Sequence, residues 1–170
     1  MEPIREETNT QKFCRLVKDY ALRDKSYRAA LHHAFGHPLR TQRTDAWMAF
    51  YRAFDQVNLP KSAEEDAYFI AGLICSQEEG EGIFFTEAIN RLPDNAYSSA
   101  MHRLRELLPV HHHEVLHKKL FGLIRYIESK ETVVIKPSYL LDDLLAWNKP
   151  THDVQRKWLR NIRELESSES

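Results

Sequence analysis

The chain has 170 residues, of which 42% are hydrophobic and 29% charged, and its formal net charge is −1. A chain of this length can bury roughly 70% of its unfolded surface, so it needs no metal or disulfide to hold a core. The two cysteines, Cys14 and Cys75, form no disulfide framework, and no apolar run approaches the roughly 20 residues of a transmembrane helix. We therefore expect a cytoplasmic protein that has no membrane partner.

Apolar residues recur at helical spacing through the first half of the chain. This spacing predicts helices over residues 13–20, 27–35 and 47–54. Ser62 and Glu65 form a capping-box pattern ahead of the segment 67–75, which is apolar on nearly every side. We expect 67–75 to be the central helix of its bundle.

The same periodicity continues through the second half of the chain. It predicts helices over residues 85–92, 97–108, 116–127, 138–147 and 154–165. Pro137 occupies a first-turn position, and Thr151 is placed to cap the last helix. The strand-like run 132–136 is too short and solitary to form a sheet.

About nine helices joined by short loops predict an all-α protein in which helices pack on helices. The segment 76–82 is the most polar connection that contains glycine, so it is the expected boundary between two bundles. We predict an N-terminal helical bundle over 1–79 and a C-terminal helical bundle over 80–166. The tail, residues 167–170, lacks apolar residues and should be disordered.

One motif suggests metal chemistry. His113 and His117 belong to an H-E-x-x-H sequence, which zinc peptidases use to place two ligands on one helix face. The third histidine of the longer zincin motif is absent, because that position is Leu123, and no feature marks a downstream glutamate as the third ligand. Lys118 and Lys119 would also place two ammonium groups beside a dication. The sequence therefore favours no metal, no cofactor and no catalytic site, with a zinc enzyme kept as an alternative.

The small net charge conceals an uneven distribution. The window 28–54 has four arginines and three histidines against one acid, and 102–125 has five Lys or Arg and five histidines against two acids. The segment 62–81, in contrast, has six acids and no Lys or Arg. Local positive fields of this kind suit phosphate binding, although ordinary solvated helix charge gives the same pattern. A second alternative is an adaptor that binds only proteins, through the acidic segment or an apolar face.

Two helices show where exposed basic groups should gather. Lys118 and Arg125 are seven residues apart and share a face with Gly122, whose missing side chain permits close approach of a backbone or phosphate. On the last helix, three arginines lie opposite the apolar stripe: Arg156, Arg160 and Arg163.

The segment SYLLDDLLAWNKPTHDVQRKWLRNI (residues 138–162) resembles the C-terminal signature of the CasB family, the small subunit of the type I-E CRISPR surveillance complex Cascade. The segments 28–36 and 98–108 also resemble helices of that family. The resemblance implies two helical bundles without enzymatic activity. It further implies a dimer beside the subunits that coat the guide RNA, with a basic surface that holds the guide–target duplex and the displaced DNA strand.

The resemblance carries the family's basic positions onto His32, His33, His102, Arg103, Lys118, Lys119, Lys149, Arg156 and Lys157. The basic windows and the helix face described above add Arg28, Arg40, Arg43, Arg52 and Arg125. This chain departs from the family where arginines become histidines. Because a neutral imidazole lacks charge, we expect nucleic-acid binding to be weaker at neutral pH and to strengthen as the pH falls.

Overall fold

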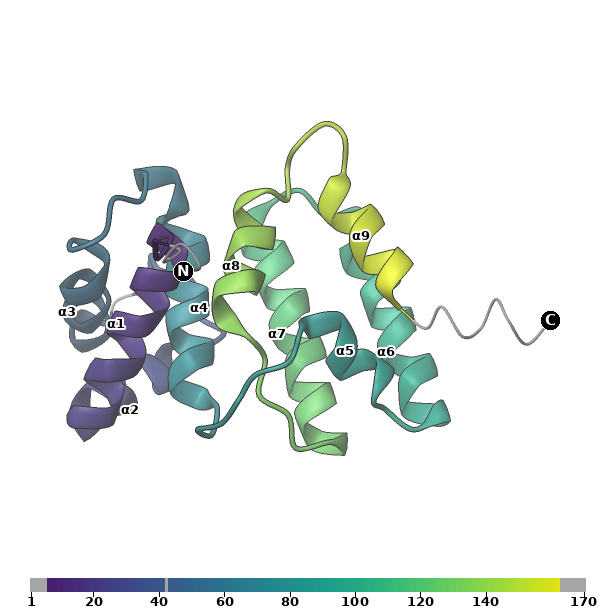
Figure 1. Ribbon diagram of the computed structural model, residues 1–170, viewed down its shortest axis with the longest axis horizontal. Coiled ribbons are helices and arrows are strands. Elements are labelled where there is room, and N and C mark those ends of the chain that lie inside the picture. Colours follow the sequence, from purple (N-terminus) through teal and green to yellow (C-terminus); the bar gives the residue numbers. More distant parts are fainter. Residues whose placement is uncertain (1–5, 42, 163–170) are drawn as a thin grey trace, which may run out of the picture. The chain divides into compact units, whose positions relative to one another are not determined.

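The computed structural model describes residues 6–41 and 43–162, and within them the fold is helical (Figure 1). This part of the chain holds nine α-helices and one short 3-10 helix, so the predicted all-α class is confirmed. Two compact units divide the chain, Met1–Gln77 and Glu78–Ser170. Within the described ranges, no helix is long and apolar enough to span a bilayer. The tail 167–170 and Arg163 lie outside the described residues.

The helices of the N-terminal unit surround one buried helix. They are α1 (Asn9–Arg23), α2 (Lys25–Ala34), α3 (Thr44–Phe54), η1 (Lys61–Ala63) and α4 (Glu64–Ser76). Every residue of α4 from Asp66 to Leu73 is buried, and α4 packs against α1 and α2. Gly72 makes this packing possible, because a Cβ atom there would lie 2.9 Å from the Cα of Phe35. As the apolar run predicts, α4 is the central helix of its unit.

The start of α4 differs from the prediction. Ser62 lies in η1 and α4 begins at Glu64 after Ala63, with no side-chain cap, so the capping box expected at Ser62 and Glu65 is wrong. The three acids of the first turn instead offset the exposed amide dipoles at this helix end. A complete capping box occurs at α1, where Thr8 and Gln11 exchange hydrogen bonds.

The C-terminal unit is built around α6 and α7, which pack on each other. Its helices are α5 (Phe85–Asn90), α6 (Asp94–Leu107), α7 (His113–Lys130), α8 (Pro137–Leu145) and α9 (Asp153–Asn161). Trp147 and Trp158 are fully buried, with ring centroids 5.2 Å apart, and the Trp147 indole donates to the Val110 carbonyl at 2.7 Å. The tryptophans therefore tie α8 and α9 to the α6–α7 connection.

The connections between the helices of this unit test the predictions for the starts of α8 and α9 and for the strand-like run. Pro137 begins α8, as predicted, whereas Thr151 does not cap α9: its N-cap is His152, in the left-handed region at φ 53°, without a side-chain cap. The run 132–136 forms no sheet within the described residues. It makes one isolated parallel bridge, between Ile83 and Ile135.

Candidate nucleic-acid interface

The exposed face of α7 gathers basic side chains. Leu116, Leu120, Leu123, Ile124 and Ile127 form the buried face of the helix. The solvent-exposed face of the helix carries the cations Lys118, Lys119, Arg125 and Lys130. The two acids of α7, Glu114 and Glu128, are half-buried and border the edge of that face on which Lys118 and Arg125 lie. A positive surface without an exposed acid therefore runs along this helix, and we call it the α7 cationic face.

The two adjacent lysines of this face are available to a ligand. Among the described residues, no ion pair or hydrogen bond engages the side chains of Lys118 and Lys119. Arg125 lies 3.5 Å from the Glu128 carboxylate, whose pKa is raised by burial and pulled down to a lesser extent by Arg125. Arg125 is thus partly neutralised, and the lysines carry most of the unshared charge.

Gly122 lies in the middle of the α7 cationic face. A Cβ atom at this position would meet nothing within 4 Å, so packing inside the protein does not require a glycine there. A glycine inside a helix costs about 1 kcal/mol relative to alanine. Gly122 therefore destabilises the helix, and it leaves the backbone uncovered between basic side chains.

The neighbouring helix α6 adds Arg103 to this region. The Arg103 guanidinium lies over the ring of Tyr126 on α7, 4.9 Å from its centroid, which fixes its position beside the α7 cationic face. His102 faces Glu106 at 3.2 Å, and its side chain is 76% exposed. Both residues line a shallow hollow on α6 together with Ser98 and Ser99.

The basic residues of α8 and α9 separate into exposed and paired groups. Lys149 and Arg156 are exposed, whereas Lys157 donates to the Asp143 carboxylate at 2.5 Å. The second oxygen of Asp143 accepts from the Trp158 indole at 2.8 Å. Lys157 is therefore held in place at the protein surface, and Arg156 points away from the buried tryptophan.

In the N-terminal unit, several predicted basic residues have contacts within the fold. The Arg28 guanidinium donates to the carbonyls of Cys75 and Gln77, at 3.2 and 2.8 Å, and so satisfies the C-terminal end of α4. Arg52 lies over the Tyr20 ring at 4.1 Å. Arg40 is exposed and Arg43 half-buried.

His32 and His33 are exposed on α2. Their rings are nearly parallel, at 14°, with centroids 6.0 Å apart. Both imidazole rings are therefore open to solvent on the same turn of α2.

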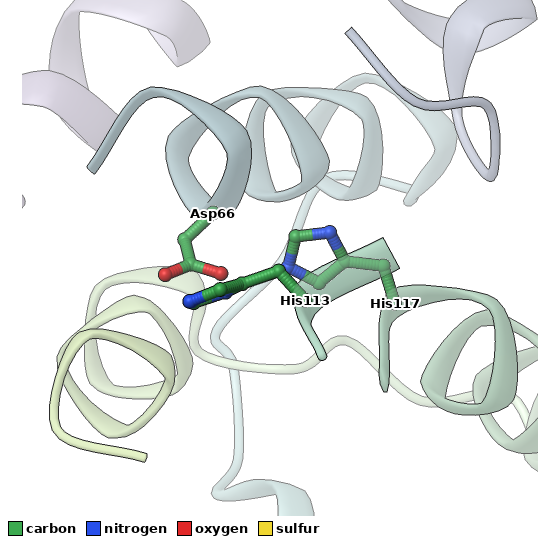
Figure 2. A group of neighbouring side chains, drawn as sticks. All are labelled: Asp66, His113 and His117. Atoms are coloured by element: carbon green, nitrogen blue, oxygen red, sulfur yellow. The ribbon is translucent and has the colours of Figure 1, made fainter. Parts of the chain in front are cut away.

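The two motif histidines extend from neighbouring turns of α7 (Figure 2). The ring centroids of His113 and His117 are 5.9 Å apart, and both side chains are half-buried. In the described part of the C-terminal unit, no third carboxylate, cysteine or histidine completes a metal-binding group with them. Asp66, also labelled in Figure 2, belongs to α4 of the N-terminal unit.

A protein-family model described as CRISPR-associated protein Cse2 matches residues 27–161, which is most of the chain. The chain belongs to the Cse2 family. The resemblance to the CasB family is thereby confirmed, since solved structures of similar fold carry either name. No curated protein sequence matches this Cse2 chain significantly.

Several solved structures share the fold of this Cse2 chain. A Cse2-family CRISPR-associated protein from Thermus thermophilus superposes with a TM-score of 0.73 at 19% identity, over 91% of this chain and 97% of its own. The CasB of M. ruber superposes with a TM-score of 0.66 at 23% identity, over 96% of this chain and 97% of its own. A chain of a CRISPR RNA-guided surveillance complex superposes with a TM-score of 0.71 at 20% identity, over 95% of this chain and 98% of its own.

Within the C-terminal unit of this Cse2 chain, the structure brings together Arg103, Lys118, Lys119 and Arg125. Lys130 extends the α7 cationic face, and its ammonium lies 5.8 Å from the Tyr126 ring centroid. The prediction from the sequence omits Lys130, although its spacing of eleven residues from Lys119 on a helix could have identified it.

Proposed function

We propose that this Cse2 chain is the small subunit of a Cascade-type surveillance complex and that it binds the sugar–phosphate backbone without catalysing a reaction. The observation that carries the proposal is the α7 cationic face. It exposes four basic side chains and no acid, and Gly122 leaves the helix backbone open between them.

The shape of this face suits a linear polyanion. From Lys118 to Lys130 the helix rises about 18 Å at 1.5 Å per residue. The charges follow its length in two rows, Lys118 with Arg125 and Lys119 with Lys130. A phosphodiester chain carries regularly spaced negative charges, and it can lie on a helix where no side chain intervenes. An acidic protein surface would not require an uncovered backbone at Gly122.

The proposed partners follow from the family. We infer that the chain works beside other Cascade subunits, including those that coat the guide RNA, and with a second copy of itself. The guide–target duplex and the displaced DNA strand are the proposed ligands of its basic surface. Support comes from a fold neighbour of 95% coverage, which is a chain of a CRISPR RNA-guided surveillance complex.

The test is binding of the full-length chain to a fluorescein-labelled single strand of DNA, measured by anisotropy at about 0.1 M salt. Each phosphate contact contributes roughly 0.7 to the salt slope of a single strand, so each lysine adds about fivefold in affinity at this salt concentration. The variant Lys118→Ala/Lys119→Ala should therefore bind about 25-fold more weakly than the unchanged chain.

A charge-matched control separates a local effect from a general one. Lys25 and Lys61 are exposed lysines of the N-terminal unit, and Lys25→Ala/Lys61→Ala removes the same charge. We expect this control to change affinity by less than about threefold. Equal losses in the two variants would contradict a defined interface. Binding of other subunits without any nucleic-acid binding would favour the protein-only adaptor.

A further inference from the structure

A small pocket opens at the surface of the C-terminal unit, and no residue of the α7 cationic face lines it. Its volume is about 210 Å³, and it lies where the beginnings of α5 and α8 meet α9. The lining includes two aromatic side chains, Phe84 and Tyr139, and polar groups of Asp143, Lys157 and Asn161. A pocket below the roughly 300 Å³ of typical small-molecule sites suits one planar ring rather than a larger ligand.

The aromatic pair at the mouth of the pocket is unusually exposed. Phe84 is 46% and Tyr139 47% accessible, although both are large rings. They meet edge to face at 77°, with centroids 5.0 Å apart. Single exposed apolar residues are common, but two rings that meet over a pocket offer a stacking surface to a third ring.

The backbone holds a cation against these rings. The Ile83 amide donates to the Val134 carbonyl and the Lys136 amide donates to the Ile83 carbonyl, both at 2.8 Å. The two segments approach so closely because residue 82 is glycine: a Cβ there would lie 3.0 Å from the Lys136 nitrogen. The Lys136 ammonium is thereby placed 4.5 Å from the Phe84 ring centroid and 5.5 Å from that of Tyr139.

The charge around the pocket favours an anionic polymer. Among the described residues of the lining, Asp143 is the one acid, and it already accepts hydrogen bonds from Lys157 and the Trp158 indole. Lys136 therefore adds positive charge that no acid among the described lining residues offsets. An aliphatic protein side chain would gain nothing from these cations and an aromatic one only a cation–π contact, whereas a nucleotide carries both a ring and a phosphate.

We propose that this pocket receives an unpaired base of a bound single strand, stacked on Phe84 and Tyr139, while Lys136 contacts the adjoining phosphate. The inference rests on the proposed function, because it assumes that a strand lies on this protein. It adds one contact to a base, whichever base is present, to a binding mode that otherwise consists of contacts to the phosphate backbone. Stacking of this kind tolerates any base, since every base has a π-face.

The test compares two labelled strands of equal length, oligothymidine and a strand of abasic residues, which carry the same phosphates. The full-length chain should bind oligothymidine roughly tenfold more tightly at low salt. Tyr139→Ala should abolish that preference and leave affinity for the abasic strand unchanged. Tyr139→Phe keeps the ring and should keep the preference. Phe84→Ala provides a second variant with the same expected loss as Tyr139→Ala, should the latter fail to fold.

The outcomes separate this inference from the proposed function. Lys118→Ala/Lys119→Ala should weaken both strands equally and preserve their ratio. Equal binding of the two strands by the unchanged chain, or an unchanged ratio in Tyr139→Ala, overturns the base pocket and leaves backbone binding intact. Absence of salt-dependent binding to either strand overturns both proposals. A Tyr139→Ala variant that loses self-association or subunit binding, with its strand ratio unchanged, would make the pocket a protein contact instead.

Discussion

The helices α4 and α7 each carry a glycine in their middle, and the two glycines serve different purposes. In α4, a Cβ on Gly72 would lie 2.9 Å from the backbone of Phe35, so the glycine is required by packing. In α7, a Cβ on Gly122 would meet nothing. The first helix is buried in the core, and the second keeps one face open. Glycine in a helix thus has a functional interpretation only where packing does not explain it.

The basic residues of the two units differ in the same way. Arg28 and Arg52 of the N-terminal unit contact carbonyls and an aromatic ring, and they therefore contribute to the fold. Lys118 and Lys119 of the C-terminal unit have no such contacts among the described residues. We infer that charge is structural on the first two and available for binding on the second two.

The largest effect in this comparison is expected from Gly72→Ala. The added methyl group must displace the backbone of Phe35, and overpacking of a core costs up to about 3 kcal/mol. Chemical denaturation followed by circular dichroism should show this loss in the free energy of unfolding. A stability equal to that of the unchanged chain would contradict the close packing of α4 on α2.

Arg28→Ala should follow, with a loss of about 2 kcal/mol in the free energy of unfolding, because two carbonyls at the end of α4 lose a charged donor. Lys25→Ala, an exposed change on the same helix, is the control and should cost less than about 0.5 kcal/mol. If Arg28→Ala instead weakened strand binding and left stability unchanged, the arginine would belong to the interface.

Gly122→Ala should move stability and binding in opposite directions. The free energy of unfolding should rise by up to about 1 kcal/mol, because alanine favours the helix and meets no neighbour. Affinity for a single strand should fall severalfold, since the methyl group lies where the phosphate chain approaches. Denaturation and anisotropy on the same preparation check both effects. Unchanged or tighter binding would show that the strand does not contact this position.

The smallest effect expected is a dependence on pH. Lowering the pH from 8 to 6 crosses the ordinary pKa of histidine, about 6.5, so imidazoles near phosphates gain charge and affinity should rise a few-fold. His32→Gln/His33→Gln should reduce this rise, because the variant removes the exposed parallel pair of α2. A flat affinity across this range, measured with every histidine intact, would refute proton-linked binding.

Much of the fold could be predicted from the sequence, because a helix that buries one face must repeat apolar residues at helical spacing. The stripes of α1 and α7 and the nearly continuous apolar run of α4 determine helices that pack on helices. Helix starts were harder to predict, because Ser62 and Thr151 have the chemistry of caps but not the position. The preference of a serine or threonine side chain for capping a helix is weak. A 3-10 turn before α4 and a left-handed residue before α9 therefore take the place of these caps.

The candidate site was predictable to the extent that helical spacing decides which side chains share a face. Lys118, Gly122 and Arg125 could be grouped in this way. Arg28 could not be assigned, since its partners Cys75 and Gln77 lie far along the chain and are backbone carbonyls, which leave no mark in a sequence. The pairing of Phe84 with Tyr139 likewise depends on a bridge between distant segments.

The salt dependence of single-strand binding tests the central claim most directly. Affinity of the full-length chain and of Lys118→Ala/Lys119→Ala should be measured from about 0.05 to 0.3 M salt and plotted as log K against log salt. Two lost phosphate contacts should flatten the slope by about 1.4. The same slope in both proteins would contradict the account, because these lysines would then touch no phosphate.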